Sequence, residues 1–205
     1  MEDTTDTEES VETADVGADL ADNAGEQVGT DAGDGASDFQ AVTDAQVVSA
    51  TEALGQMEAL RPEVWEGLGV EERLEALQGI EDRMAEIQGR PAVAVGTATL
   101  EEGTYGGYRS DYGIVLNEAH VASNDIAEIV DSVVHEGRHA YQDYAIHHLG
   151  FVSDASLVES WTANWDNPLS AQDYGQEAYM AQPIEADAWA YAGRIRQALY
   201  GREQL

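Results

Sequence analysis

Two histidines stand four residues apart, with a glutamate directly after the first, in a stretch that has the pattern of a helix. From His135 to His139 the sequence reads His-Glu-Gly-Arg-His. At 3.6 residues per turn the two histidines lie one turn apart on one face, so both imidazoles can reach a single metal ion. Glu136 lies about 100° further round, where its carboxylate can take a proton from a metal-bound water. This spacing predicts a zinc site at which water is activated.

The residues before this motif predict an amphipathic helix that carries it. Apolar residues recur at helical spacing from Ile126 to Val134, and residues 123–125, Ser-Asn-Asp, can cap the helix. The apolar face continues into the motif, so the histidines are expected to point into the body of the domain. The helix is expected to run to about Leu149 and to end at Gly150. The alternative is an amphipathic helix whose histidines are only hydrogen-bonded.

A catalytic zinc needs a third protein ligand and one open position for water. The last expected helix begins at Pro183, a residue tolerated in a first turn, and carries Glu185 and Asp187 in an alanine-rich sequence. The two carboxylates lie about 200° apart round the helix, so only one can face the metal. Glu185 is preferred because its face continues through Ala188 and Ala192, which allow close packing. Asp187 then faces solvent or supports a ligand from behind; alternatively, both acids are surface charges.

The three remaining histidines are less favoured as metal ligands. His147 and His148 come at the end of the motif helix, where a positive charge suits the negative end of the helix dipole. His120 lies in the link before that helix. The predicted ligand set is therefore His135, His139 and one downstream carboxylate.

The chain is strongly acidic. Its net charge is −32, from 41 acidic residues, nine arginines and no lysine. Such a surface repels nucleic acid and anionic lipid, so neither is expected as a partner. The first 44 residues hold fourteen of the acids and no base, which leaves a large acidic excess on the remainder. This excess predicts a halophilic protein adapted to high salt, where screening suppresses self-repulsion, whereas a GC-rich coding bias is the other account of the missing lysines.

The sequence carries no sign of export or membrane insertion. It has no cysteine, hence no disulfide and no thiolate ligand for zinc. Its first twenty residues lack the positive and apolar regions of a secretory signal, and no stretch approaches the roughly eighteen apolar residues of a membrane span. A cytoplasmic location is expected, with export by a route that reads no N-terminal signal left open.

Composition and periodicity divide the chain into three segments. Residues 1–44 contain almost no large apolar side chain and are expected to be a disordered acidic tail. The tail is either a solubilising segment, a lure for a basic partner or a shield over the site. Residues 45–91 show helical spacing, with Val47, Val48, Thr51 and Leu54 expected on one apolar face of the first helix. They are expected to form a scaffold, against which residues 92–205 pack as the catalytic half. Residues 45–205 are expected to be one compact domain.

Residues 92–117 change to a strand pattern, with a turn-rich, aromatic stretch from Gly103 to Tyr108 and a second turn at Asp111-Tyr-Gly113. Two or three antiparallel strands are expected here, before the motif helix. The fold class is therefore α+β, mostly helical with a small antiparallel sheet. A strand just before the motif helix can offer its edge to an extended peptide, although a plain structural hairpin has the same pattern.

The arrangement resembles the small gluzincin metallopeptidases, the zincins whose third ligand is a glutamate on a downstream helix. The resemblance covers residues 105–195 and rests on Tyr105-Gly-Gly-Tyr108 with Ile114-Val-Leu-Asn117, on the His135–Gln142 stretch and on Gln182-Pro-Ile-Glu185-Ala-Asp-Ala188. It implies that Zn²⁺ is held by His135, His139 and Glu185. It also implies a zincin-like fold and peptide-bond hydrolysis with Glu136 as the base.

Three functional classes follow from these observations. The first is a zinc-dependent metallopeptidase that acts on peptides or proteins through a metal-bound water activated by Glu136. The second is a catalytically inactive zinc-binding domain, and the third is an acidic protein-interaction domain in which the motif is accidental. Enzymes of the resembled family often use a tyrosine or histidine to stabilise the oxyanion. The sequence does not select this residue among the candidates Tyr105, Tyr108, Tyr174 and Tyr179, and no oligomeric state is predicted.

Overall fold

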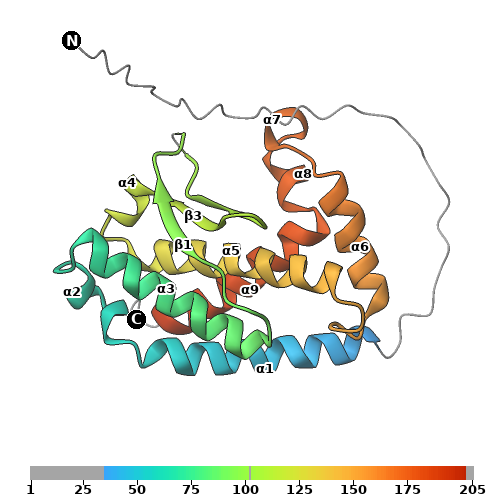
Figure 1. The fold of residues 1–205 in the computed structure, drawn as a ribbon, viewed down its shortest axis with the longest axis horizontal. Coiled ribbons are helices and arrows are strands. Elements are labelled where there is room, and N and C mark those ends of the chain that lie inside the picture. The colour runs from blue at the N-terminus through green and yellow to red at the C-terminus, as the bar shows by residue number, and fades with distance from the viewer. Residues whose placement is uncertain (1–34, 102, 202–205) are drawn as a thin grey trace, which may run out of the picture. The chain divides into compact units, whose positions relative to one another are not determined.

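A computed structural model describes residues 35–101 and 103–201 of the chain. Over these residues the protein is mostly helical and has one small sheet (Figure 1), which confirms the α+β class. The elements in chain order are α1 (Gly35–Gly55), the 3-10 helix η1 (Glu58–Leu60), α2 (Pro62–Trp65), α3 (Val70–Gln88), β1 (Val95–Ala98), β2 (Gly106–Arg109), β3 (Gly113–Asn117), α4 (Glu118–Val121), α5 (Ile126–His147), α6 (Ala155–Asp166), α7 (Ala171–Tyr174), α8 (Gln176–Met180) and α9 (Pro183–Tyr200).

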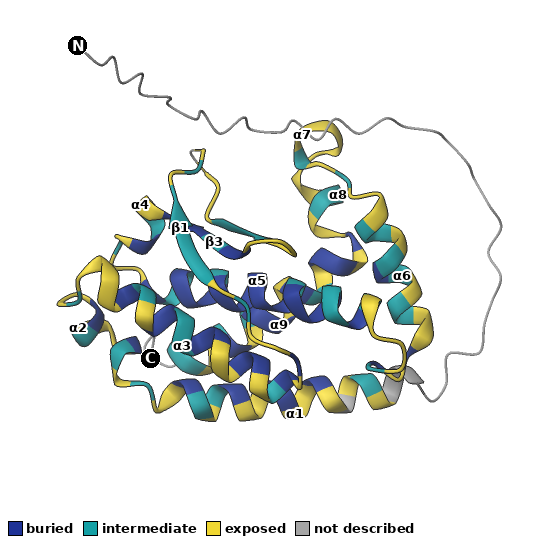
Figure 2. Ribbon diagram, viewed as in Figure 1, coloured by how far each residue is buried: buried dark blue, intermediate teal, exposed yellow. Residues whose placement is uncertain are grey.

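Helix α5, which carries the motif, is the central element of the described part. It packs against α9 and α3, and strands β2 and β3 lie against it. Figure 2 shows that much of its surface is buried, as the apolar spacing before the motif predicts. Its start matches the expected cap, because the Asp125 side chain accepts a hydrogen bond from the Glu128 backbone N–H at 3.2 Å. The helix ends at His147, within two residues of the expected end.

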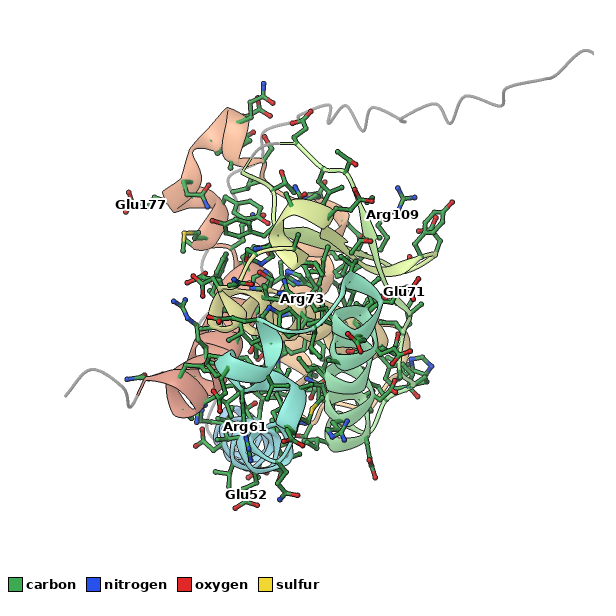
Figure 3. All side chains as sticks on the ribbon, turned by 90° about the vertical axis from the view of Figure 1, so that its left-hand side faces the viewer. Glu52, Arg61, Glu71, Arg73, Arg109 and Glu177 are labelled. Atoms are coloured by element: carbon green, nitrogen blue, oxygen red, sulfur yellow. The ribbon has the colours of Figure 1, made fainter. Side chains whose placement is uncertain are left out.

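A buried arginine on α3 holds the segment that leads into α5. The Arg73 guanidinium donates to the carbonyl oxygens of Val121 at 2.9 Å, Ser123 at 2.7 Å and Trp65 at 3.0 Å. Arg73 is 5% exposed, whereas the side chain of Arg61 is 61% exposed (both labelled in Figure 3). The segment that leads into the motif helix is therefore anchored to α3 by hydrogen bonds from one buried side chain to backbone carbonyl oxygens, which the sequence pattern does not reveal.

The sheet is mixed, so the expectation of a purely antiparallel sheet is wrong for one strand pair. Strands β2 and β3 form the expected antiparallel hairpin, but β1 pairs in parallel with β3, and the order is β1-β3-β2. The chain reverses direction after β1 and again after β2, and β3 inserts between the two earlier strands. The strand next to the motif helix in sequence, β3, is thus central. The strands at the two edges are β1 and β2.

Helix α1 begins earlier than the expected boundary at residue 44. Residues 35–44 form its first half, whereas the disorder expected for residues 1–34 concerns residues outside the described part. The face that packs inward includes Thr43, Val47 and Leu54, as the spacing of apolar residues predicts for the last two. Val48, expected on this face, is 58% exposed instead.

Among the helices of the described ranges, none is long and apolar enough to cross a membrane.

Phe39, in the segment expected to be tail, joins α1 to the body of the domain. Its ring lies edge-on to Trp161 on α6, with centroids 5.7 Å apart, and 5.6 Å from the guanidinium of Arg138 on α5. Phe39→Ala is therefore expected to lower the free energy of unfolding by about 2 kcal/mol in a urea titration. Val42→Ala, at an exposed position of the same helix, is expected to change it by less than about 0.5 kcal/mol. Equal effects of the two substitutions would contradict this packing role.

Candidate metal centre

The structure brings His135 and His139 of α5 together with Glu185 of α9. The two Nε2 atoms lie 3.1 Å apart, and the Glu185 carboxylate lies 3.4 Å from Nε2 of His135 and 3.6 Å from Nε2 of His139. The three side chains are 8%, 12% and 10% exposed, respectively. Among the described residues they form the one group of at least three His, Cys, Asp or Glu side chains that could hold a metal ion. The ligand set expected from the sequence is thus spatially assembled.

The donor atoms have a spacing that suits a zinc ion. Two atoms that each lie about 2.1 Å from a tetrahedral zinc are about 3.4 Å apart, close to all three distances in this cluster. One of the carboxylate oxygens, Oε2 of Glu185, is buried and has no hydrogen-bond donor among the described residues. A buried carboxylate oxygen without a donor is costly unless a cation is bound to it. The residues present therefore fit a zinc ion.

The electrostatics of the cluster favour a positive charge at its centre. Burial alone would raise the pKa of Glu185, but the two imidazoles, 3.4 and 3.6 Å from its carboxylate, and the hydrogen bond from Tyr179 hold this pKa well below its usual value. Burial lowers the pKa of His139, but the hydrogen bond to Glu185 and the charges of Glu136 and Glu185 outweigh it and raise this pKa to about 9. A proton on His139 thus supplies the positive charge that a metal ion would bring.

Glu136 is placed to face the cluster without joining it. It follows His135 on α5 and is 9% exposed. Its negative charge adds to the raised pKa of His139 and of Tyr179, as expected for a carboxylate near both groups. A carboxylate beside the ligands, rather than among them, is the position required of a proton acceptor.

Asp187 lies behind the predicted metal ligands. It accepts two hydrogen bonds from Arg138, Nε to Oδ2 at 2.8 Å and Nη2 to Oδ1 at 3.0 Å, and a third from Gln142 at 2.8 Å. The same Gln142 contacts Nδ1 of His139 at 2.8 Å. Of the alternatives open for Asp187, the structure therefore selects the supporting position over a solvent-facing one.

Of the four tyrosines considered as oxyanion donors, Tyr179 is the one in contact with a predicted ligand. Its hydroxyl donates to Oε1 of Glu185 at 2.8 Å. Burial and the neighbouring carboxylates raise its pKa, so the phenol keeps its proton. Tyr108 instead donates to Asp143 at 2.6 Å, and Tyr105 stacks on His120 with ring centroids 4.5 Å apart. Tyr174 is 42% exposed.

The three other histidines lie outside the cluster, as expected. His120 hydrogen-bonds Ser132 Oγ at 3.0 Å. His147 pairs with Asp143, and His148 stacks on Tyr144; both are exposed at the end of α5.

Trp189 of α9 packs beside the cluster. Its ring centroid lies 4.5 Å from that of His135, and the residue is 37% exposed. The cluster therefore has an aromatic wall that reaches the surface.

Gly137, inside the motif, is required by a buried ion pair. Arg90 donates to Glu81 at 2.6 and 2.9 Å and to the Gly137 carbonyl oxygen at 2.9 Å. A Cβ added at Gly137 would lie 3.0 Å from Glu81 Oε2 and 3.5 Å from Arg90 Nη2. Because Glu81 also accepts from the Val93 backbone N–H, its carboxylate has little room to move. The motif helix is thus clamped to α3 at the turn between the two histidines.

Gly137→Ala is therefore expected to destabilise the protein by about 1–3 kcal/mol despite the better helix propensity of alanine. Gly193→Ala on α9 is the matched control, since a Cβ there has no neighbour within 4 Å. It is expected to stabilise the protein by up to about 1 kcal/mol. Urea unfolding of the two variants measures both effects, and the same sign in both would contradict the clamp.

Sequence reasoning did not identify Gln142, Arg138 and Arg90 as supporting residues. Gln142 and Arg138 could have been found from the helix periodicity once the face that carries the two histidines is known. Positions 138 and 142 lie one turn apart on a neighbouring part of α5. Arg90 gives no such signal, since its partners Glu81 and Gly137 come from separate helices.

Comparison of the chain with protein-family models, with curated proteins and with solved structures finds no match.

Proposed function

We propose that this protein is a zinc-dependent metallopeptidase of zincin type that cleaves peptide bonds in peptides or proteins. The observation that carries the proposal is the cluster of His135, His139 and Glu185, whose donor atoms lie 3.1–3.6 Å apart, with Glu136 beside it. Two histidines and a glutamate are one of the ligand sets of catalytic zinc, which keeps its fourth position open. The resemblance of the motif helix and the Glu185 helix to the small gluzincins supports the same conclusion.

Each residue of the site has a role in this reaction. Zinc, when bound, would lower the pKa of a water in its open position and polarise the carbonyl of the scissile bond. Glu136 would take the proton of that water and later deliver it to the nitrogen of the leaving amine. The Tyr179 hydroxyl donates its one hydrogen to Glu185 and would turn it to the carbonyl oxygen, where it would stabilise the negative charge.

The free edge of β2 supports an extended peptide as the substrate. β2 is the antiparallel edge strand of the sheet and contacts α5, the helix that carries Glu136. A substrate segment would pair with this edge through main-chain hydrogen bonds.

Zinc content and hydrolysis together test the proposal. Wild-type protein, folded in high KCl because of its net charge of −32, is expected to hold about one zinc per chain by elemental analysis and to hydrolyse an unfolded protein. Glu185→Ala is expected to lose most of the zinc. Glu177→Ala, which replaces an exposed glutamate on α8 (Figure 3), is expected to keep it.

The outcomes separate the three functional classes. If the protein binds zinc but does not hydrolyse the unfolded protein, it is a non-enzymatic zinc domain and not a peptidase. No zinc in the wild type would leave an acidic α+β interaction domain whose motif is accidental. Loss of zinc in both glutamate variants would show that Glu185 is not a specific ligand.

A further inference from the structure

A buried glutamine links the two helices that form the metal centre. Gln142 is 0% exposed and lies one turn after Arg138 on the face of α5 that meets α9. Its side-chain amide has three partners: Nε2 lies 2.9 Å from the Ile184 carbonyl oxygen and 2.8 Å from Asp187 Oδ2, and Oε1 lies 2.8 Å from His139 Nδ1. Every polar atom of this amide is thus engaged, two of its contacts with α9 and one with a metal ligand.

The chemistry of these partners determines which way the amide points. A carbonyl oxygen and a carboxylate oxygen are both acceptors, so the atom that faces them must be the NH₂ group. The amide oxygen therefore faces His139, where an oxygen can only accept. Nδ1 of His139 must then carry a hydrogen and donate it.

A hydrogen on Nδ1 has a direct consequence for metal binding at the other ring nitrogen. A metal ion binds the neutral imidazole, in which only one nitrogen is protonated, so a hydrogen held on Nδ1 leaves the lone pair of Nε2 for the metal. Nε2 is the atom that faces His135 and Glu185. We propose that Gln142 is a positioning residue that keeps the proton of His139 on Nδ1 and thereby presents Nε2 to the metal ion.

Arg138 and Asp187 keep Gln142 in this orientation. The Arg138 guanidinium is 0% exposed and binds the Asp187 carboxylate through two hydrogen bonds, so the carboxylate cannot rotate away from Gln142. Rings of Tyr141 and Tyr191 flank the guanidinium at 4.3 and 4.5 Å. The Arg138–Asp187 ion pair thus fixes His139 only indirectly, through the neutral amide of Gln142. No charged group contacts Nδ1 of His139 by this route.

The other histidine ligand has no such support. Nδ1 of His135 is buried and has no hydrogen-bond partner among the described residues. The two histidines therefore differ: His139 is held in one protonation pattern by the protein, and His135 is not. Without Gln142, neither imidazole ring is expected to be held in one protonation pattern.

The experiment compares Gln142→Met with Gln172→Met, an exposed control on α7. The zinc dissociation constant is measured by competition with a chromophoric chelator. Removal of a hydrogen bond behind a metal ligand typically weakens binding about 10–100-fold, and this loss is expected for Gln142→Met alone. In metal-free protein, the Nδ1–H proton of His139 is followed by NMR. It is expected to be protected from solvent exchange in the wild type and in Gln172→Met, and to lose this protection in Gln142→Met.

Gln142→Asn provides a second variant should Gln142→Met fold poorly. Its amide is one methylene shorter and cannot contact His139 and α9 together, so the same loss of zinc affinity and of Nδ1–H protection is expected. An unchanged zinc affinity in folded Gln142→Met, or an unprotected Nδ1–H in the wild type, would overturn the inference. The expected loss of zinc affinity rests on the proposed function, whereas the NMR measurement of Nδ1–H does not. If wild-type protein binds no zinc but its Nδ1–H is protected, the peptidase proposal is refuted and the hydrogen bond from His139 to Gln142 still stands.

Discussion

Replacement of Glu136 by glutamine is expected to leave one zinc per chain and to lower the rate of peptide hydrolysis by about 10²–10⁴-fold. Glutamine has nearly the same shape as glutamate but cannot accept a proton from water at neutral pH. The proposed metal ligands are His135, His139 and Glu185, so the substitution removes no donor atom from the cluster. Zinc content by elemental analysis and the rate of cleavage of an unfolded protein measure the two effects separately.

Glu159→Gln is the matched control for this substitution. Glu159 is exposed on α6, and its replacement removes one negative charge without touching the cluster. It is expected to change neither the zinc content nor the rate. If Glu136→Gln keeps the wild-type rate, Glu136 is not the base. If it loses zinc, Glu136 takes part in metal binding, which its position beside the cluster argues against.

Asp187→Ala is expected to lower the free energy of unfolding by about 3–5 kcal/mol. The substitution leaves the Arg138 guanidinium in the interior without a counter-charge, and Arg138 is 0% exposed. Gln142 also loses one of its two acceptors on α9. The effect is therefore much larger than the roughly 0.5 kcal/mol common for surface positions. Urea unfolding of the metal-free protein isolates it from any change in zinc binding.

Two further variants test the origin of this loss. Asp166→Ala removes an exposed carboxylate from the end of α6 and is expected to have little effect on stability. The double variant Arg138→Met with Asp187→Leu removes both charges and is expected to recover most of the lost stability, because a buried ion pair can be replaced by apolar side chains of similar volume. A double variant as unstable as Asp187→Ala would mean that lost packing, not the unpaired charge, causes the effect.

The local features of the site could be predicted from the sequence. The helix from Ile126, its Asp125 cap and the common face of His135 and His139 depend on residues within one or two turns of each other. The start of α9 at Pro183 is likewise a local signal. The choice of Glu185 over Asp187 used only the angle between them and the small residues on one face.

The features that the sequence did not predict depend on contacts between distant segments. The pairing of β1 with β3 is parallel because β3 inserts between β1 and β2, and periodicity within a strand carries no information on strand order. The extension of α1 into an acidic stretch depends on Phe39, which packs on Trp161 far along the chain. Local composition favours a tail there, and one tertiary contact outweighs it.

The sequence by itself determined the chemistry available to this protein: two histidines and a glutamate on one helix, and a carboxylate on a second. Only the tertiary structure decided how these groups are held. Arg138, Asp187 and Gln142 act together because α5 packs against α9, and Gly137 is needed because Arg90 and Glu81 meet the motif helix there. The physical reason is that helical spacing is a property of neighbouring residues, whereas the orientation of a buried hydrogen bond depends on every segment that surrounds it.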